Sequence, residues 1–351
     1  MVFDSLFQPK RLERRRDMLS IPNFADRLCG EIKQKKSILC CGLDPQLRYM
    51  PPHLVKEAVG RFGRSFQAIR WLFAEFNRKI IDAVADFVVC VKPQRAFYEA
   101  YGSDGDQAFV ETVRYARGHG LLVIEDAKRN DGGDTADAYA DGHIGEVPFF
   151  SPNDKEGVTI LGRAESPTRV DCMTITPYIG EDCVVRFVAR VKEFGTGIFV
   201  VTKTSFKPNS AVEQLWMFDK NSRLWQAVAN MVQQWGEGTE GACGLRNVGV
   251  VMGATYPGDA VIMRQILPNS IFLIPGYGGQ GASADDAVVG IREEGFGGII
   301  NNSRNLTYAW QNKKGAHQCE SEKFDEAARL QAIDDRDALA EACKRAGKWP
   351  F

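Results

Sequence analysis

Residues 121–131 of the chain read LLVIEDAKRND, an apolar run that ends in a cluster of charged side chains. A short run of this kind, rich in large apolar residues, is typical of a parallel strand that is buried on both faces. Side chains alternate along a strand, so a strand that continues through Lys128 directs Asp126 and Lys128 to the same side as Leu122 and Ile124. The segment therefore predicts a buried strand with an acid and a base together at its carboxyl end.

Seven further runs of the same kind occur along the chain. Segments with apolar residues at helical spacing lie between several of them, notably residues 66–84 and 184–191, and Ser283 is a suitable N-cap for a helix over 283–294. This alternation predicts an α/β protein, a (β/α)8 TIM barrel with parallel strands and its active site at the C-terminal face. The eight predicted strands are 37–42, 87–91, 121–125, 172–176, 198–202, 248–252, 271–274 and 298–301.

Most of these runs end in polar residues that are common in catalytic sites. In a TIM barrel the functional side chains lie where the strands end, so these residues are expected to converge. A structural ion-pair network is the alternative, but a buried charge cluster is costly unless it is fully paired, which favours function. The residues are Asp44, Lys92, Gln94, Asp126, Lys128, Thr202, Lys203, Asn302, Ser303 and Arg304.

The seventh run is followed by a glycine-rich loop, GYGGQG at residues 276–281. Its spacing fits a dinucleotide-binding fingerprint, but the next strand ends in two asparagines, where that fold would place an acid that binds ribose. Loops after strands seven and eight of a TIM barrel commonly bind phosphate, and the planar guanidinium of Arg304 suits that ligand. We expect a phosphate site here, with a loop that serves only as a turn as the alternative.

Composition excludes several classes of protein. The 351 residues contain 44 Lys and Arg against 45 Asp and Glu, so there is no overall field that would attract nucleic acid or an anionic membrane. Nine cysteines without a CxxC pair, and no hydrophobic signal region, indicate a reduced, cytoplasmic protein. Four scattered histidines provide no zinc-ligand spacing, so we expect no metal site. We expect an N-terminal tail over residues 1–20, rich in arginine but interrupted by acids, and a single barrel domain over 21–351 with long loops near 141–169 and 206–221.

A series of short motifs in this order, over roughly residues 37–310, resembles the orotidine 5'-phosphate decarboxylase family, in particular its longer microbial and protozoan branch. The lysine of CVKP, together with Gln280 and Arg304, makes this resemblance specific, because the D-x-K-x-x-D core is shared with sugar-phosphate enzymes. The motifs are CCGLDP, CVKPQRAFYE, VIEDAKRNDGGDT, TITPYIGED, VVTKTS, IPGYGGQGA and NNSRN.

The resemblance implies that the chain decarboxylates orotidine 5'-monophosphate to uridine 5'-monophosphate without a cofactor. Lys92, Asp126, Lys128 and Asp131 would form the charged catalytic array. The chain would act as a homodimer in which Asp131 and Thr135 reach the partner subunit's site. The resemblance also implies that Asp44 and Lys92 hold the ribose hydroxyls, and Gln94 stands where the family often has Asn. Thr174 or Thr176 would contact the base. Gln280 and Arg304 would hold the phosphate, with Gly278 and Gly279 shaping the loop and Ser303 as a further substrate contact.

Three points stay open at this stage. Gly132 follows Asp131 where the family usually has a branched apolar residue, which puts the packing of that loop in question. The loop near 206–221 follows strand five at the catalytic face and is either a lid or a surface insertion. The alternative functions are a Mg2+-dependent sugar-phosphate decarboxylase or aldolase of the same superfamily and a non-catalytic nucleotide-binding barrel.

Overall fold

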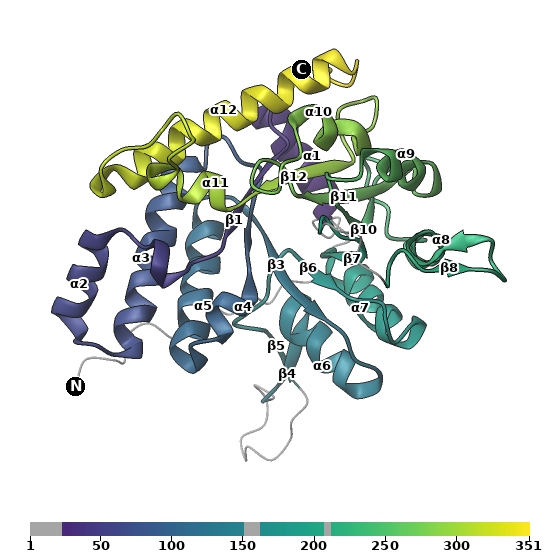
Figure 1. Cartoon of the computed structure of the whole chain (residues 1–351). Coiled ribbons are helices and arrows are strands. Elements are labelled where there is room, and N and C mark those ends of the chain that lie inside the picture. The colour runs from purple at the N-terminus through teal and green to yellow at the C-terminus, as the bar shows by residue number, and fades with distance from the viewer. Residues whose placement is uncertain (1–22, 151–161, 207–211) are drawn as a thin grey trace.

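The computed structural model describes residues 23–150, 162–206 and 212–351, and its centre is a closed barrel of eight parallel strands (Figure 1). Every predicted run contributes one barrel strand, so the predicted fold is confirmed. The expected tail over residues 1–20 lies outside the described residues. In spatial order the barrel strands are β1 (Leu39–Leu43), β12 (Gly298–Asn302), β11 (Ser270–Pro275), β10 (Arg246–Met252), β7 (Gly197–Lys203), β6 (Cys172–Ile175), β3 (Leu122–Arg129) and β2 (Cys90–Pro93).

The barrel strands are buried almost throughout, which explains their unbroken apolar sequences. Every residue of β1, β2, β6, β10 and β12 is buried. Cys40, Cys41, Cys90 and Cys172 are fully enclosed there and act as small hydrophobic side chains. Burial on both faces is expected when helices cover the outside of a barrel whose interior is filled by side chains.

Helices surround the barrel, as the alternation of patterns predicts. The predicted helices at 66–84 and 184–191 are confirmed as α3 and α7, and Ser65 caps α3 by accepting a hydrogen bond of 3.2 Å from the amide of Ala68. The helices are α1 (Phe24–Lys35), α2 (Pro52–Phe62), α3 (Phe66–Val84), α4 (Arg95–Glu99), α5 (Gly102–Gly118), α6 (Gly133–Ile144), α7 (Glu181–Phe194), α8 (Leu224–Trp235), α9 (Pro257–Ile266), α10 (Ala284–Ala287), α11 (Arg304–Thr307) and α12 (Phe324–Arg345).

The helix predicted over 283–294 is wrong in its length. Ser283 does cap it, by accepting from the amide of Asp286 at 3.1 Å, but α10 ends at Ala287 and is followed only by the 3-10 turn Val288–Gly290. Gly290 packs so closely that a β-carbon there would lie 2.9 Å from the ring of Phe272. The backbone then turns through Gly295, at a φ of 79°, so apolar spacing alone overestimated this helix.

Both long loops contain short antiparallel hairpins. The segment expected as a loop near 141–169 begins inside α6 and includes the pair β4 (Glu146–Phe149) and β5 (Gly162–Glu165). The segment near 206–221 includes β8 (Trp216–Met217), which pairs with β9 (Ser222–Arg223). Residues 151–161 and 207–211 of these loops lie outside the described residues.

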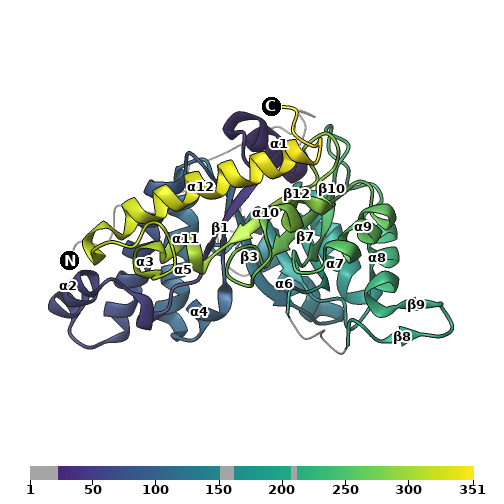
Figure 2. The same cartoon turned by 45° about the horizontal axis from the view of Figure 1, so that its top comes forward.

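The C-terminal helix α12 lies on the outside of the barrel and runs across the helices near β12 (Figure 2). It packs against α3, α10 and α11, and its buried side includes Phe324, Ala328, Ala332 and Leu339. One polar residue, Asp335, is buried with them. This arrangement brings α12 close to the carboxyl ends of β11 and β12.

Candidate active site

Several predicted site residues meet at the carboxyl ends of the barrel strands, whereas Lys203 is buried in an ion pair with Glu213 and Thr202 bonds to the carbonyl of Val200. The centre of the group is Asp126 on β3, which is 9% exposed and accepts hydrogen bonds from side chains of two neighbouring strands and of its own strand. Lys92 donates to Oδ2 of Asp126 at 2.9 Å and Gln94 donates to the same oxygen at 3.2 Å. Lys128 donates to Oδ1 of Asp126, so both side chains point to the same side, as predicted. The predicted acid and base are therefore in direct contact.

Thr174 on β6 supports this contact from the other side. Its hydroxyl donates to Oδ1 of Asp126 at 2.9 Å and accepts from the backbone amide of Lys128 at 3.0 Å. Lys128 has a φ of 51°, in the left-handed region that residues with a β-carbon rarely adopt. The register of β3 against β6 also shifts between Glu125 and Arg129. Strain of this kind persists where surrounding contacts enforce it, and it concentrates at functional sites.

The charges of the group stabilise one another. Burial disfavours a charge on Asp126, but Lys92 and Lys128 outweigh that effect and hold the pKa of Asp126 well below its ordinary value. Burial also disfavours a charge on Lys92, but Asp126 and Asp44 keep the pKa of Lys92 above its ordinary value. Asp126 and Lys92 are therefore both charged at neutral pH, and the group keeps a fixed electric field at the barrel mouth.

Asp44, at the end of β1, lies near Lys92 and has a carboxylate oxygen that accepts no hydrogen bond in the described structure. Its Oδ1 atom is buried and has no hydrogen-bond partner among the described residues. Burial raises the pKa of Asp44, and the nearby Lys92 only partly opposes this. A buried acceptor without a partner is costly, so this oxygen is suited to accept from a ligand hydroxyl.

A cavity of about 190 Å³ continues from Asp44 to the ends of β11 and β12. Gly279, Gln280, Ser303 and Arg304 line it, as predicted for a phosphate site. The guanidinium of Arg304 is exposed and makes no hydrogen bond or ion pair with any residue that the structure describes. The cavity therefore combines a free cation with a glycine-rich loop, which is the arrangement that an anion requires.

Gly278 is required by the geometry of this loop. It has a φ of 67°, and a β-carbon at this position would lie 2.8 Å from Nδ2 of Asn305. Larger residues would push the loop away from the end of β12. The prediction that glycine shapes this loop therefore has a steric basis.

Three predicted residues lie apart from the central contacts. Thr135, near the start of α6, is exposed, and Asp131 is half-buried, with its carboxylate accepting from the amide of Gly132 at 2.8 Å. Thr176 is half-buried just after β6, and its hydroxyl has no hydrogen-bond partner within the described ranges. A β-carbon at Gly132 would lie 3.1 Å from a carboxylate oxygen of Asp182, so the glycine fits a tight local space.

Sequence reasoning missed Tyr308 and Phe97, which also line the cavity. The hydroxyl of Tyr308 donates to the carbonyl of Asp44 at 3.0 Å and accepts from the amide of Gln46 at 3.0 Å. Its ring stacks on Phe76 of α3 with the centroids 5.4 Å apart, which fixes its direction. Tyr308 follows α11, outside every strand end, so no pattern in the sequence distinguished it from a core aromatic residue.

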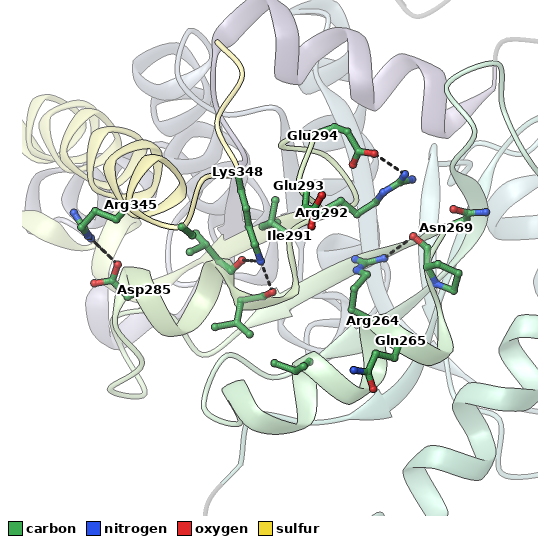
Figure 3. A pocket seen from close by; sticks show the side chains of 15 residues that line it. Arg264, Gln265, Asn269, Asp285, Ile291, Arg292, Glu293, Glu294, Arg345 and Lys348 are labelled. Atoms are coloured by element: carbon green, nitrogen blue, oxygen red, sulfur yellow. Dashed lines mark hydrogen bonds and ion pairs between the residues drawn. The ribbon is translucent and has the colours of Figure 1, made fainter.

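A larger cavity, of about 770 Å³, lies at the opposite end of β11 and β12 (Figure 3). The arginine side chains Arg264 and Arg345 of this cavity already have protein partners. Arg264 donates to the backbone carbonyls of Gly290, Gly297 and Ser270 at 2.7–2.9 Å, and Arg345 pairs with Asp285 at 2.7 Å. These contacts attach the C-terminal segment to the barrel, so Arg264 and Arg345 have structural partners in this cavity.

The described residues contain no group of three or more His, Cys, Asp or Glu side chains that is placed to hold a metal ion. Within the same ranges, none of the helices combines the length and the hydrophobicity needed to cross a bilayer.

Comparison with known proteins identifies the family. The model of the family described as orotidine 5'-phosphate decarboxylase / HUMPS matches residues 37–319. An orotidine 5'-phosphate decarboxylase of Caldicellulosiruptor saccharolyticus is 36% identical over 290 residues, which cover 83% of this chain and 91% of that protein. One from Rhodopirellula baltica is 35% identical over 316 residues, covering 90% of this chain and 98% of the relative. The solved structure of Leishmania donovani OMP decarboxylase is 27% identical, with a TM-score of 0.62 and coverage of 90% of this chain and 100% of that one. The chain therefore belongs to the orotidine 5'-phosphate decarboxylase / HUMPS family.

Proposed function

We propose that the chain decarboxylates orotidine 5'-monophosphate to uridine 5'-monophosphate and CO2, without a metal or organic cofactor. The observation that carries this proposal is the contact of Lys92, Asp126 and Lys128 at the carboxyl ends of β2 and β3. Family membership and the names of the relatives support the same reaction. The cavity lined by Asp44, Gln280 and Arg304 would hold the phosphate end of a nucleotide substrate.

The difficult step is cleavage of the bond between C6 of the pyrimidine and its carboxylate. CO2 leaves, and the bonding electron pair remains on C6, where no adjacent carbonyl delocalises it. The ammonium of Lys128 stabilises this charge and then transfers a proton to C6, after which solvent protonates the lysine again. The side chain of Lys128 is 43% exposed, so its ammonium is able to reach a ligand in the barrel mouth.

Asp126 has two roles in this scheme. It holds Lys128 in position, and its negative charge lies against the substrate carboxylate. That charge disfavours the bound carboxylate more than neutral CO2, so the repulsion is relieved during cleavage. Four donors fix Asp126, which prevents it from turning away: Lys92, Gln94, Lys128 and Thr174.

The remaining residues bind the nucleotide. We assign Asp44, Lys92 and Gln94 to the ribose, and Ser303, Arg304, Gln280, Gly278 and Gly279 to the phosphate. For the base we assign Thr176, because the hydroxyl of Thr174 is already bound to Asp126 and to the amide of Lys128. Binding energy from the remote phosphate then holds the reacting carbon in the strong field beside Lys128.

We propose in addition that the enzyme is a homodimer in which Asp131 and Thr135 complete the partner subunit's site. An exposed apolar surface beside these residues supports this arrangement. Tyr178 is 85% exposed and Ile179 is 51% exposed, and Ile179 lies next to Gly132. Large exposed apolar side chains commonly mark protein interfaces. The nine cysteines, all within the described residues, are unpaired, which supports a place in the reducing cytoplasm.

The direct test is the loss of orotidine 5'-monophosphate absorbance, measured with the wild-type protein and with Lys128→Ala. We expect turnover of the wild type with and without a chelator, and a loss of at least about 10⁴-fold in kcat for Lys128→Ala. Lys56→Ala serves as the control, because Lys56 is exposed on α2 and far from the site in the fold. Normal turnover by Lys128→Ala would contradict the mechanism.

Two other results would indicate a different function. Activity that a chelator abolishes and Mg2+ restores would indicate a sugar-phosphate enzyme of the same superfamily. Tight binding of uridine 5'-monophosphate without any decarboxylation would indicate a nucleotide-binding protein.

A further inference from the structure

One buried carboxylate near the phosphate cavity has no part in the scheme above. Asp335 lies on α12, outside the residues 37–319 that the family model matches, and it is 4% exposed. Oδ1 accepts from the hydroxyl of Tyr277 at 3.1 Å and from Gln331 at 3.0 Å. Oδ2 accepts from Nδ2 of Asn302 at 2.7 Å. Asp335 therefore connects α12 to two other parts of the chain.

The two distant partners of Asp335 come from two different segments that line the phosphate cavity. Tyr277 belongs to the glycine-rich loop after β11, and Asn302 is the last residue of β12, directly before Ser303 and Arg304. Both residues line the cavity. A single carboxylate thus links the loop that carries Gln280 to the strand end that carries Arg304.

The glycine-rich loop is closed by backbone hydrogen bonds between its own residues. The amide of Gly278 donates to the carbonyl of Ala282 at 3.1 Å, and the amide of Ala282 donates to the carbonyl of Gly276 at 3.3 Å. Within the described chain, the hydroxyl of Tyr277 makes the only side-chain hydrogen bond from residues 276–282 to the rest of the protein. Loss of this bond leaves the position of the loop less well defined.

Burial of the Asp335 carboxylate also costs free energy. Burial raises the pKa of Asp335 to about 6, although Asn302, Gln331 and Tyr277 oppose this by hydrogen bonding. An apolar residue at this place on α12 would avoid that cost, since the other side chains of this helix face are apolar. The carboxylate is retained where it accepts from both segments that line the cavity.

We propose that Asp335 is a positioning residue for the phosphate subsite, through which α12 holds the glycine-rich loop and the end of β12 at the separation that a nucleotide phosphate requires. This inference rests on the proposed function, because it assigns that cavity to the phosphate. Asp335 itself does not touch the ligand. Its effect is therefore expected in phosphate affinity and not in the chemical step.

The experiment compares binding of uridine 5'-monophosphate and of uridine by calorimetry in the wild type and in Asp335→Ala. We expect Asp335→Ala to raise the Kd of the monophosphate about tenfold, because two positioning hydrogen bonds are lost, and to leave the Kd of uridine unchanged. Asp335→Asn is expected to restore most of the affinity, since its amide accepts from Asn302 and donates to the Tyr277 hydroxyl. In turnover of orotidine 5'-monophosphate, KM should rise in Asp335→Ala while kcat stays at the wild-type value.

Two further variants serve as controls. Gln331→Ala removes the third hydrogen bond to Asp335 from the same helix without touching the cavity, and it should leave the Kd of the monophosphate unchanged. Tyr277→Phe removes only the bond to the loop and should raise that Kd by about threefold to fivefold. It also keeps the proposal testable if Asp335→Ala fails to fold.

An unchanged Kd for the monophosphate in Asp335→Ala would overturn the proposal, and so would equal losses for uridine and for the monophosphate. The proposed reaction is tested separately. A wild type that binds the monophosphate with this dependence on Asp335, but releases no CO2 from orotidine 5'-monophosphate, would refute the reaction and support the positioning role.

Discussion

Arg304 is exposed at the cavity proposed for the phosphate and has no partner of its own in the described structure, so its removal should act through the ligand and not through folding. We predict that Arg304→Ala raises KM for orotidine 5'-monophosphate by about 100-fold, since a charge-assisted contact to phosphate is lost. Free phosphite should stimulate the wild type on orotidine, which lacks the phosphate, and should not stimulate Arg304→Ala. Steady-state kinetics on both substrates measure this, with Arg61→Ala on α2 as the control. Equal stimulation of both proteins would contradict the assignment.

Asp335 should also make stability depend on pH. Its pKa is about 6 in the fold and near 3.8 in the unfolded chain, so the buried group prefers its neutral form. Its stabilising contribution is therefore complete below about pH 3.8 and is lost as the pH rises through about 6. Relative to Asp335→Asn, the wild type should lose about 3 kcal/mol of unfolding free energy between pH 4 and pH 7.5. Urea titrations across this range test the sign, and a difference that does not change with pH would refute it.

The positions and contacts of some site residues could be predicted from the sequence, and those of others could not. Asp126 and Lys128 are two positions apart on one strand, so alternation predicted that both side chains point into the barrel mouth. The left-handed backbone of Lys128 could not be predicted, because the amide bonds to Thr174, which is 46 residues away. Asp335 bonds to residues 33 and 58 positions away, and nothing in the pattern of α12 indicates those partners.

Among the elements, β3 and α6 are joined by a buried contact directly beside the site. Glu125, which is fully buried, bonds through Oε2 to Nδ1 of His143 at 2.6 Å, and α6 begins next to Asp131. We predict that His143→Ala destabilises the protein by about 3 kcal/mol, because it leaves a buried carboxylate without this partner. Urea unfolding measures the change.

The matched control for this contact is His119→Ala. His119 forms a similar pair with Asp82, 3.1 Å apart, but at the surface. Exposed pairs contribute little, so its removal should cost less than about 1 kcal/mol. Equal losses of unfolding free energy for the two substitutions would mean that the contact of Glu125 with His143 stabilises the protein no more than a surface pair does.

At the scale of elements, the sequence predicted all eight barrel strands, because continuous apolar runs identify strands that are buried on both faces. It was wrong for the helix over 283–294, which ends at Ala287 and continues as a 3-10 turn in which Gly290 packs against the ring of Phe272. It also gave no indication of the two short hairpins in the long loops. Local periodicity reports burial, but it does not report where a side chain of a neighbouring strand packs against the backbone.

For the whole molecule, the proposed dimer makes a sharp prediction about mixed subunits. Lys128→Ala and Asp131→Ala should each be inactive alone, because each lacks one part of every shared site. In a mixed dimer, one site contains both defects and the other contains none, so mixing should restore roughly a quarter of wild-type activity at random assembly. Activity of refolded mixtures of the two variants measures this. No recovery, with both variants shown to exchange subunits, would place Asp131 in its own subunit's site.

The barrel is closed by pairing its first strand with its last. Cys40 of β1 lies opposite Asn301 of β12, and these residues are 261 positions apart in the chain. Contacts between such distant segments require closure of a long loop, which is slow and is expected late in folding. Asp44 lies on one side of this seam and Ser303 and Arg304 lie on the other. The nucleotide cavity therefore forms only when the seam closes, so a bound nucleotide should slow unfolding while leaving the folding rate unchanged.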